Sequence, residues 1–172
     1  METPEFSRLY RADEIGAVPL AVSIEATPDE CAALATRFDL IAVATLRATG
    51  HVMLRDKHCI AEGQFEAEVT QACVVTGEPV RAHIAQDFKL RFIDEDAVPD
   101  TAEIELSFDE YDDMPNTGDG IDMGEAVAQS MALALPPFPR GPNAARRLRE
   151  AGVVSEGEET RGAFAGLKDL LK

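Results

Sequence analysis

The stretch that decides the fold runs from residue 60 to residue 92 and reads IAEGQFEAEVTQACVVTGEPVRAHIAQDFKLRF. Apolar and polar residues alternate in its two halves, so that Phe65, Ala67 and Val69 share one side of an extended chain. A period of two is typical of half-buried β-strands. Gly77 and Pro79 interrupt the pattern between the two halves, and both residue types favour turns. The stretch therefore predicts an antiparallel hairpin with a longer, irregular turn.

Upstream of this hairpin, the pattern predicts a strand and then a helix. Residues 20–26 alternate between apolar and polar types. Thr27 and Glu30 have the spacing of a capping box, which predicts that a helix over residues 28–37 begins here. Cys31 lies on the apolar side of that helix, so we expect its thiol to be packed in the core rather than reactive.

Residues 40–46 are apolar at nearly every position, which predicts a central strand covered on both faces. Gly50 is expected to end this strand. After the hairpin, residues 102–108 alternate as a short strand, whereas residues 112–120 contain proline, asparagine and glycine and predict a loop.

Two further helices are predicted in the last third of the chain. Asp122 has the position of an N-cap, with Glu125 as its capping-box partner. Met123 and Met131 lie on the apolar stripe of this helix, where methionine most often fills the core. Residues 143–151 predict a shorter helix.

These elements predict an α+β fold: a twisted antiparallel sheet of about five to seven strands, able to curl toward a barrel, packed with two or three helices. A length of 172 residues fits one domain, which we expect to cover residues 1–142. Residues 143–172 are expected to form the short helix, a Gly/Glu linker and an amphipathic tail. The chain lacks a signal peptide and any apolar run of about 18 residues, so we expect a cytoplasmic protein without membrane contact.

The sequence offers no recognisable catalytic constellation. Its three cysteines are scattered and form no Cys-x-x-Cys pair, which favours free thiols over a disulfide framework. Cys59 follows His58, but adjacency in sequence does not make a nucleophile and its base. A Gly-rich phosphate loop and a nucleophile elbow are missing. We therefore expect no enzyme, no metal and no cofactor; a small enzyme with a divalent cation on its acidic loops is the catalytic alternative.

The charge is strongly negative and unevenly distributed. There are 32 acidic and 16 basic side chains, for a net charge of −16, and residues 94–125 contain neither Lys nor Arg. Such a field repels phosphate backbones, including those of DNA, and attracts basic proteins. It is either a solubilising face or a partner-binding surface. The candidate partner-binding residues are Asp94, Glu95, Asp96, Asp109, Glu110, Asp112 and Asp113.

One basic surface remains, formed by Arg140, Arg146, Arg147 and Arg149. Guanidinium groups bind phosphates and carboxylates in the same forked geometry. The four arginines are therefore candidates for RNA contact, and the alternative is pairing with the acidic face of the protein itself.

Three motifs resemble the YceD family, whose members are called large ribosomal RNA subunit accumulation proteins. They are CVVTGEPV at residues 73–80, IDMGE at 121–125 with LALPP at 133–137, and FAGL at 164–167. The resemblance implies a non-enzymatic factor that supports large-subunit ribosomal RNA accumulation and ribosome assembly. Together with the charge, it favours a basic ribosomal protein or assembly factor as the partner, with limited rRNA contact. The alternative is an adaptor that binds a basic or amphipathic protein at a sheet edge or at the acidic face.

The chain departs from the family at one corner. Many members carry a Cys-x-x-Cys in the hairpin turn and further cysteines after the Leu-Pro motif, a set that suits structural zinc. Here Cys73 is present, Thr76 stands in place of its partner, and no cysteine follows Pro136. One thiolate cannot hold zinc, so we expect this corner to be held without metal.

Overall fold

The computed structural model describes residues 4–94, 111–116 and 120–153. The chain divides into two compact units, residues 1–71 with 81–137, and residues 72–80 with 138–172. The first unit contains the β-sheet with two helices, and the second contains the hairpin turn with one helix. The domain boundary that we predicted after residue 142 stays a prediction.

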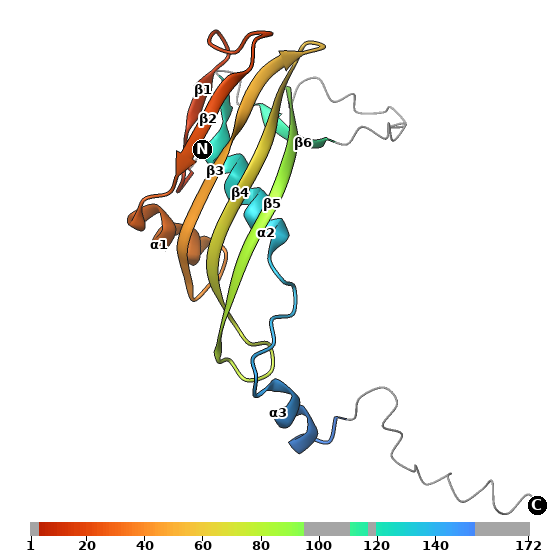
Figure 1. The fold of residues 1–172 in the computed structure, drawn as a ribbon. Coiled ribbons are helices and arrows are strands. Elements are labelled where there is room, and N and C mark those ends of the chain that lie inside the picture. Colours follow the sequence, from red (N-terminus) through yellow and green to blue (C-terminus); the bar gives the residue numbers. More distant parts are fainter. Residues whose placement is uncertain (1–3, 95–110, 117–119, 154–172) are drawn as a thin grey trace, which may run out of the picture. The chain divides into compact units, whose positions relative to one another are not determined.

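The main sheet has five strands in the order β2-β3-β4-β5-β6 (Figure 1). The pairs β2–β3 and β3–β4 are antiparallel, whereas β6 lies parallel to β5. The α+β prediction is confirmed, but the sheet is mixed and stays open rather than closing into a barrel. The strands are β2 (Leu20–Glu25), β3 (Ala42–Arg55), β4 (His58–Ala72), β5 (Pro79–Asp94) and β6 (Asp112–Asn116); β1 (Leu9–Arg11) pairs with β7 (Gly120–Asp122) in a separate two-stranded sheet.

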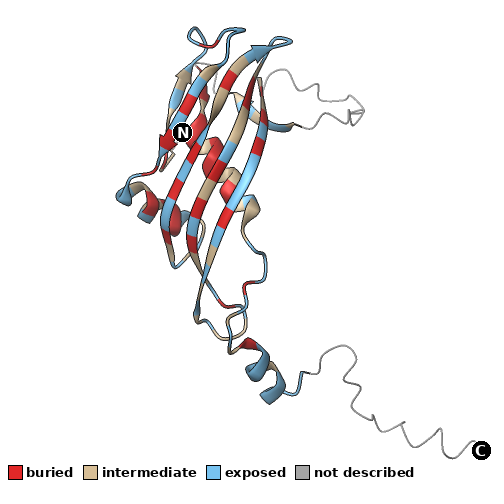
Figure 2. Cartoon of the chain, viewed as in Figure 1, coloured by how far each residue is buried: buried red, intermediate tan, exposed pale blue. Residues whose placement is uncertain are grey.

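The predicted hairpin is confirmed as β4 and β5, and its alternation matches the burial of its side chains. Phe65, Ala67 and Val69 are buried, while the residues between them face outward (Figure 2). The buried side packs with α1 (Pro28–Arg37) and α2 (Met123–Ala134) in one core. Met123 and Met131 are fully buried there, as their helical spacing predicted. In the described ranges, no helix is both long and apolar enough to cross a membrane.

The capping box of α1 is confirmed in both directions. Thr27 Oγ1 accepts a hydrogen bond from the Glu30 N–H at 3.3 Å, and the Glu30 carboxylate accepts one from the Thr27 N–H at 2.7 Å. Arg8 donates to both carboxylate oxygens of Glu30 at 2.7 and 2.9 Å. The Arg8 guanidinium, and to a lesser extent the Thr27 backbone, lower the pKa of Glu30 to about 2. One carboxylate thus begins the helix and ties the N-terminal segment to it.

The capping box predicted for α2 is wrong in its second half. Asp122 Oδ1 does accept from the N–H groups of Gly124 and Glu125, at 3.0 and 3.2 Å. The Glu125 carboxylate, however, pairs with Arg37 of α1 at 2.6 Å and accepts from Gln129 at 2.7 Å. A bidentate ion pair with arginine is stronger than a hydrogen bond from a neutral backbone N–H group. The Glu125 carboxylate therefore binds Arg37 instead of the N-cap backbone. Arg37 accordingly lowers the pKa of Glu125.

Two predictions about β3 are also wrong. Gly50 does not end β3, which continues to Arg55 with Gly50 opposite Gly63 of β4. A Cβ atom at either glycine would lie less than 3.0 Å from backbone atoms of the other strand, so the pair allows a close approach of the two chains. The expected cover on both faces of residues 40–46 is wrong too, because Ala44 and Thr45 are exposed.

The loop predicted over residues 112–120 contains a strand. Residues Asp112 to Asn116 pair with β5 although Pro115 lacks an N–H group. Proline is tolerated here because β6 is the last strand in the sheet order. The strand predicted over residues 102–108 lies outside the described residues. The helix predicted over residues 143–151 is confirmed as α3 (Ala144–Glu150).

Candidate interaction surfaces

Three of the seven acidic candidates lie among the described residues, at the end of β5 and the start of β6. Asp94 is the last residue of β5, and Asp112 and Asp113 are the first residues of β6. Asp112 and Asp113 are both exposed, and Asp113 pairs with Arg91 at 2.6 Å. Glu95, Asp96, Asp109 and Glu110 lie outside the described residues.

Tyr111, at the start of this acidic edge, is a residue that the sequence analysis missed. Its hydroxyl donates to Glu62 of β4 and accepts from the Arg55 guanidinium of β3 at 2.9 Å. The hydrogen bond to Glu62 is the main cause that raises the pKa of Tyr111. The Tyr111 hydroxyl therefore links the residue just before β6 to outward-facing side chains of β3 and β4. No pattern in the sequence predicts this contact.

The arginine candidates all lie in the second unit. Arg140 is exposed in the segment before α3, and the other three are exposed on α3. Arg147 pairs with Glu150 at 3.2 Å, and Arg146 lies 3.9 Å from the same carboxylate. Arg140 and Arg149 form no ion pair with any residue that the structure describes. Two of the four guanidinium groups are therefore paired within the helix and two are not.

A set of hydrogen bonds, here called the clamp, joins the hairpin turn to the segment before α3. The Val74 N–H donates to the Pro139 carbonyl at 3.0 Å, and the Gly141 N–H donates to Cys73 Sγ at 3.3 Å. Asn143 Nδ2 donates to the two carboxylate oxygens of Glu78 at 2.9 and 3.2 Å. These partners are 65 to 68 residues apart in sequence.

The turn itself is closed by shorter-range hydrogen bonds. The Cys73 N–H donates to the Glu78 carbonyl at 2.8 Å, and the Gly77 N–H donates to the Cys73 carbonyl at 2.8 Å. Gly77 adopts a φ of 73°, a left-handed conformation that favours glycine. The Thr76 hydroxyl donates to Glu78 Oε2 at 3.1 Å, which leaves this carboxylate with both a local and a long-range donor.

The residues of this corner do not fit a structural zinc ion. Cys73 is the single thiol, and hydrogen bonds to its sulfur, above all that from the Gly141 N–H, lower its pKa to about 7. A second thiolate would be needed where Thr76 stands, and the Thr76 hydroxyl is instead bonded to Glu78. In the part of the chain that the structure describes, no three His, Cys, Asp or Glu side chains gather as a metal site.

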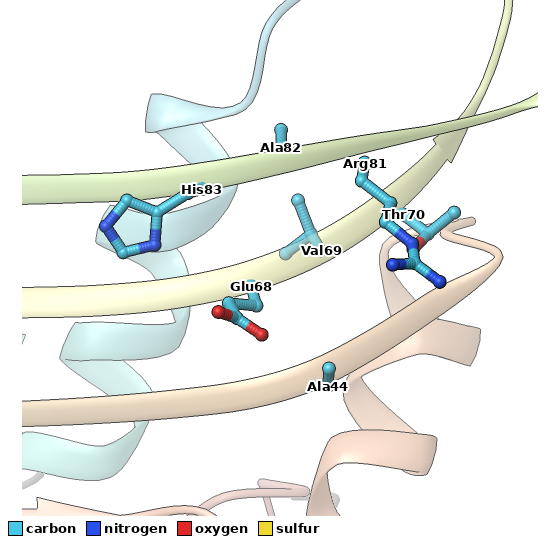
Figure 3. A pocket seen from close by; sticks show the side chains of 7 residues that line it. All are labelled: Ala44, Glu68, Val69, Thr70, Arg81, Ala82 and His83. Atoms are coloured by element: carbon cyan, nitrogen blue, oxygen red, sulfur yellow. The ribbon is translucent and has the colours of Figure 1, made fainter.

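A hollow lies on the sheet where β3, β4 and β5 run side by side, and Figure 3 shows the side chains that line it. Its volume is about 580 Å³. The side chains of Glu68, Arg81 and His83 lie along it and form no hydrogen bond or ion pair with a described residue. His58 and Cys59 lie elsewhere, at the start of β4, and consecutive strand residues face opposite sides of a sheet, so they do not form a catalytic pair. The described lining of the hollow is Ala44, Glu68, Val69, Thr70, Arg81, Ala82 and His83.

A second, smaller hollow of about 250 Å³ lies beside the edge of β5. It has apolar side chains from Phe65, Phe88 and Leu133, with Asp87 and Asp112 at its rim. β6 covers β5 from Leu90 to Asp94, and among the described residues no strand pairs with that side of residues 80–88. This part of the sheet edge has the geometry that an added strand uses.

The described residues form an α+β protein with a mixed, open five-stranded sheet. Against protein-family models, residues 61–171 match the family described as "Large ribosomal RNA subunit accumulation protein YceD". The chain belongs to the YceD family. The matched region begins in β4 and includes the clamp, α2 and α3. The search of curated proteins and the search of solved structures gave no match.

Proposed function

We propose that this protein is a non-enzymatic factor that supports the accumulation of large-subunit ribosomal RNA and the assembly of the large ribosomal subunit. The observation that carries the proposal is the family match, which covers residues 61–171 and therefore most of the chain. The family is named for accumulation of this RNA rather than for a reaction. The protein would act in the cytoplasm, where ribosomes are assembled.

The charge supports a specific division of contacts. At a net charge of −16, non-specific coating of RNA is unfavourable. A basic ribosomal protein or assembly factor, in contrast, is attracted by the acidic stretch of residues 94–113. In this proposal the acidic residues bind that partner, and ribosomal RNA is contacted only through the segment of residues 140–149.

The test is affinity capture of the tagged protein from a lysate of its source organism, with and without RNase and at two salt concentrations. RNase-resistant recovery of large-subunit proteins that weakens with salt is the expected result. A variant with Asp109→Asn, Glu110→Gln and Asp112→Asn should recover less. The matched control neutralises three acids outside the stretch, with Glu14→Gln, Glu25→Gln and Asp39→Asn. Equal loss in both variants would refute the acidic contact, and absence of ribosomal components under every condition would refute the assembly role.

The sheet edge favours one alternative function, an adaptor that binds a basic or amphipathic protein segment. An added strand would pair with residues 80–88 of β5, and its apolar side chain would enter the hollow at Phe88 and Leu133. Asp87 and Asp112 at the rim would favour basic residues in that segment. Capture of one non-ribosomal protein that is lost on Leu133→Asp, with no ribosomal proteins recovered, would favour this function.

A further inference from the structure

We propose that the segment of residues 138–150, held by the clamp, is a contact surface for single-stranded RNA. In this surface the Phe138 ring stacks on an unpaired base, while Arg140 and Arg149 bind phosphates of the same strand. The inference rests on the proposed function and deepens it, because it names the form of RNA and adds an aromatic contact to the arginines.

The exposure of Phe138 is the first observation. Its side chain is 73% exposed, although phenylalanine is among the residues most often buried. It is followed by Pro139, whose carbonyl is bonded to the Val74 N–H, and Val74 is itself 54% exposed. The Phe138 ring is therefore exposed to solvent next to a residue whose backbone is held by a hydrogen bond. Such rings are the platforms on which single-stranded nucleic acids stack their bases.

The charge balance of the second unit is the second observation. Its described segments, residues 72–80 and 138–153, contain four arginines against two glutamates, in a chain whose net charge is −16. Both glutamates have partners inside the unit, since Glu78 accepts from Asn143 and Glu150 lies beside Arg146 and Arg147. Among the described residues of the unit, Arg140 and Arg149 are the two arginines without an ion pair, so they are the ones that we assign to an outside ligand.

The combination of ring and arginines selects the ligand. An acidic protein segment would satisfy the guanidinium groups but would leave the Phe138 ring in water unless it also carried an apolar side chain at the matching position. Double-stranded RNA offers phosphates but keeps its bases stacked inside an A-form helix, so the ring would again lack a partner. A single strand supplies both a phosphate for each arginine and an exposed base face for the ring.

The clamp gives this surface its order. Its hydrogen bonds reach Pro139, Gly141 and Asn143, which alternate with the positions of Phe138 and Arg140. A surface that is ordered before binding loses less conformational entropy on binding. Asn143 and Glu78 are therefore positioning residues, since they act on RNA through the segment that they hold.

The experiment measures fluorescence anisotropy of a labelled, unstructured RNA of about 12 nucleotides with the purified full-length protein at low ionic strength. Phe138→Ala should weaken binding by about fivefold to 150-fold, the range for loss of one aromatic stack, and Phe138→Tyr should restore it. Val18→Ala is the matched control, because Val18 is an exposed apolar residue of the first unit and should not affect binding. Annealing the RNA to its complement should weaken binding as Phe138→Ala does.

The arginines and the clamp have separate readouts. Arg140→Gln and Arg149→Gln should each reduce the slope of log K against log salt by about 0.7, as expected for one phosphate contact on a single strand. Asn143→Ala should weaken RNA binding while leaving that slope unchanged. The substitution removes the hydrogen bonds to Glu78 that hold the segment, and it removes no positive charge.

Three results would overturn the inference: no binding of the single strand by the unaltered protein, unchanged affinity in Phe138→Ala, or equal affinity for the duplex. These results are distinct from failure of the proposed function. RNase-resistant recovery of large-subunit proteins without binding of the purified RNA would refute this surface and leave the assembly role intact. RNA binding by the purified protein without any ribosomal association would refute the assembly role and leave this RNA-contacting surface intact.

Discussion

Substitution of Gly63 by alanine should weaken the sheet at the point where β3 and β4 come closest. A Cβ atom at this position would lie 2.3 Å from the Thr49 carbonyl oxygen, 2.7 Å from Gly50 Cα and 2.8 Å from the Phe88 ring. Two of these contacts are with backbone atoms, and Phe88 is only 5% exposed, so none of them can move away freely. Overpacking of this kind costs about 1–3 kcal/mol. At about 2–4 °C per kcal/mol for a chain of this size, the melting temperature should fall by roughly 2–12 °C.

Urea and thermal denaturation followed by far-UV circular dichroism would test this value. Gly16→Ala is the matched control, because no heavy atom lies within 4 Å of its added Cβ. It should stay within about 0.5 kcal/mol of the unaltered protein or be slightly more stable. If Gly63→Ala and Gly16→Ala unfold at the same urea concentration, the close approach of the two strands at Gly63 is refuted.

Three further predictions concern stability. Glu30 has a pKa of about 2 in the fold against an ordinary value of 4.5, so its stabilisation is present above pH 4.5 and is lost as the pH falls toward 2. Because the Arg8–Glu30 pair is partly exposed, we expect Glu30→Gln to lower the free energy of unfolding by only about 1 kcal/mol at pH 7 and by almost nothing near pH 2. Urea denaturation midpoints at the two pH values measure this difference. A difference that does not depend on pH would contradict the prediction. Cys73→Ser keeps an acceptor for the clamp and should lower the melting temperature only slightly, and a chelator should not change it; zinc detected in the purified protein would refute the metal-free corner. Met131→Ala should lower the free energy of unfolding by about 2–5 kcal/mol in chemical denaturation, because Met131 is 0% exposed. Leu133→Ala, at a position that is 86% exposed, should change it by no more than about 0.5 kcal/mol. Similar losses in the two variants would contradict the burial of Met131.

The sequence predicted those elements whose signals are local. The alternation around Phe65 identified the β4–β5 hairpin, since a period of two over many residues has few other causes. Thr27 and Glu30 identified the start of α1 because both halves of the capping box lie within one turn. The same local rule failed at Glu125, where Arg37, 88 residues away in sequence, takes the carboxylate.

Features that depend on pairing between distant residues were not predictable in this way. From the sequence alone, Gly50 cannot be distinguished from a glycine that ends a strand. Only its position opposite Gly63 shows that it lies inside the strand and allows the two strands to come close together. The arginine segment was recognised by composition, but the clamp that holds it was not. Asn143 and Glu78 are 65 residues apart and neither belongs to a periodic pattern, so their hydrogen bond could be found only in three dimensions.

The two proposed contact surfaces carry opposite charge, yet salt alone does not tell them apart. Contacts of the acidic stretch with a basic protein and of Arg140 and Arg149 with phosphates are both electrostatic, and both weaken as salt rises. RNase separates them, because it removes the ligand of the arginines and leaves the ligand of the acids in place. Neutralising the acidic stretch should therefore reduce the RNase-resistant fraction of recovered ribosomal proteins, while Phe138→Ala should reduce only the RNase-sensitive fraction. If both substitutions reduced the same fraction, the two surfaces would be contacting one ligand, and the division of labour between them would be wrong.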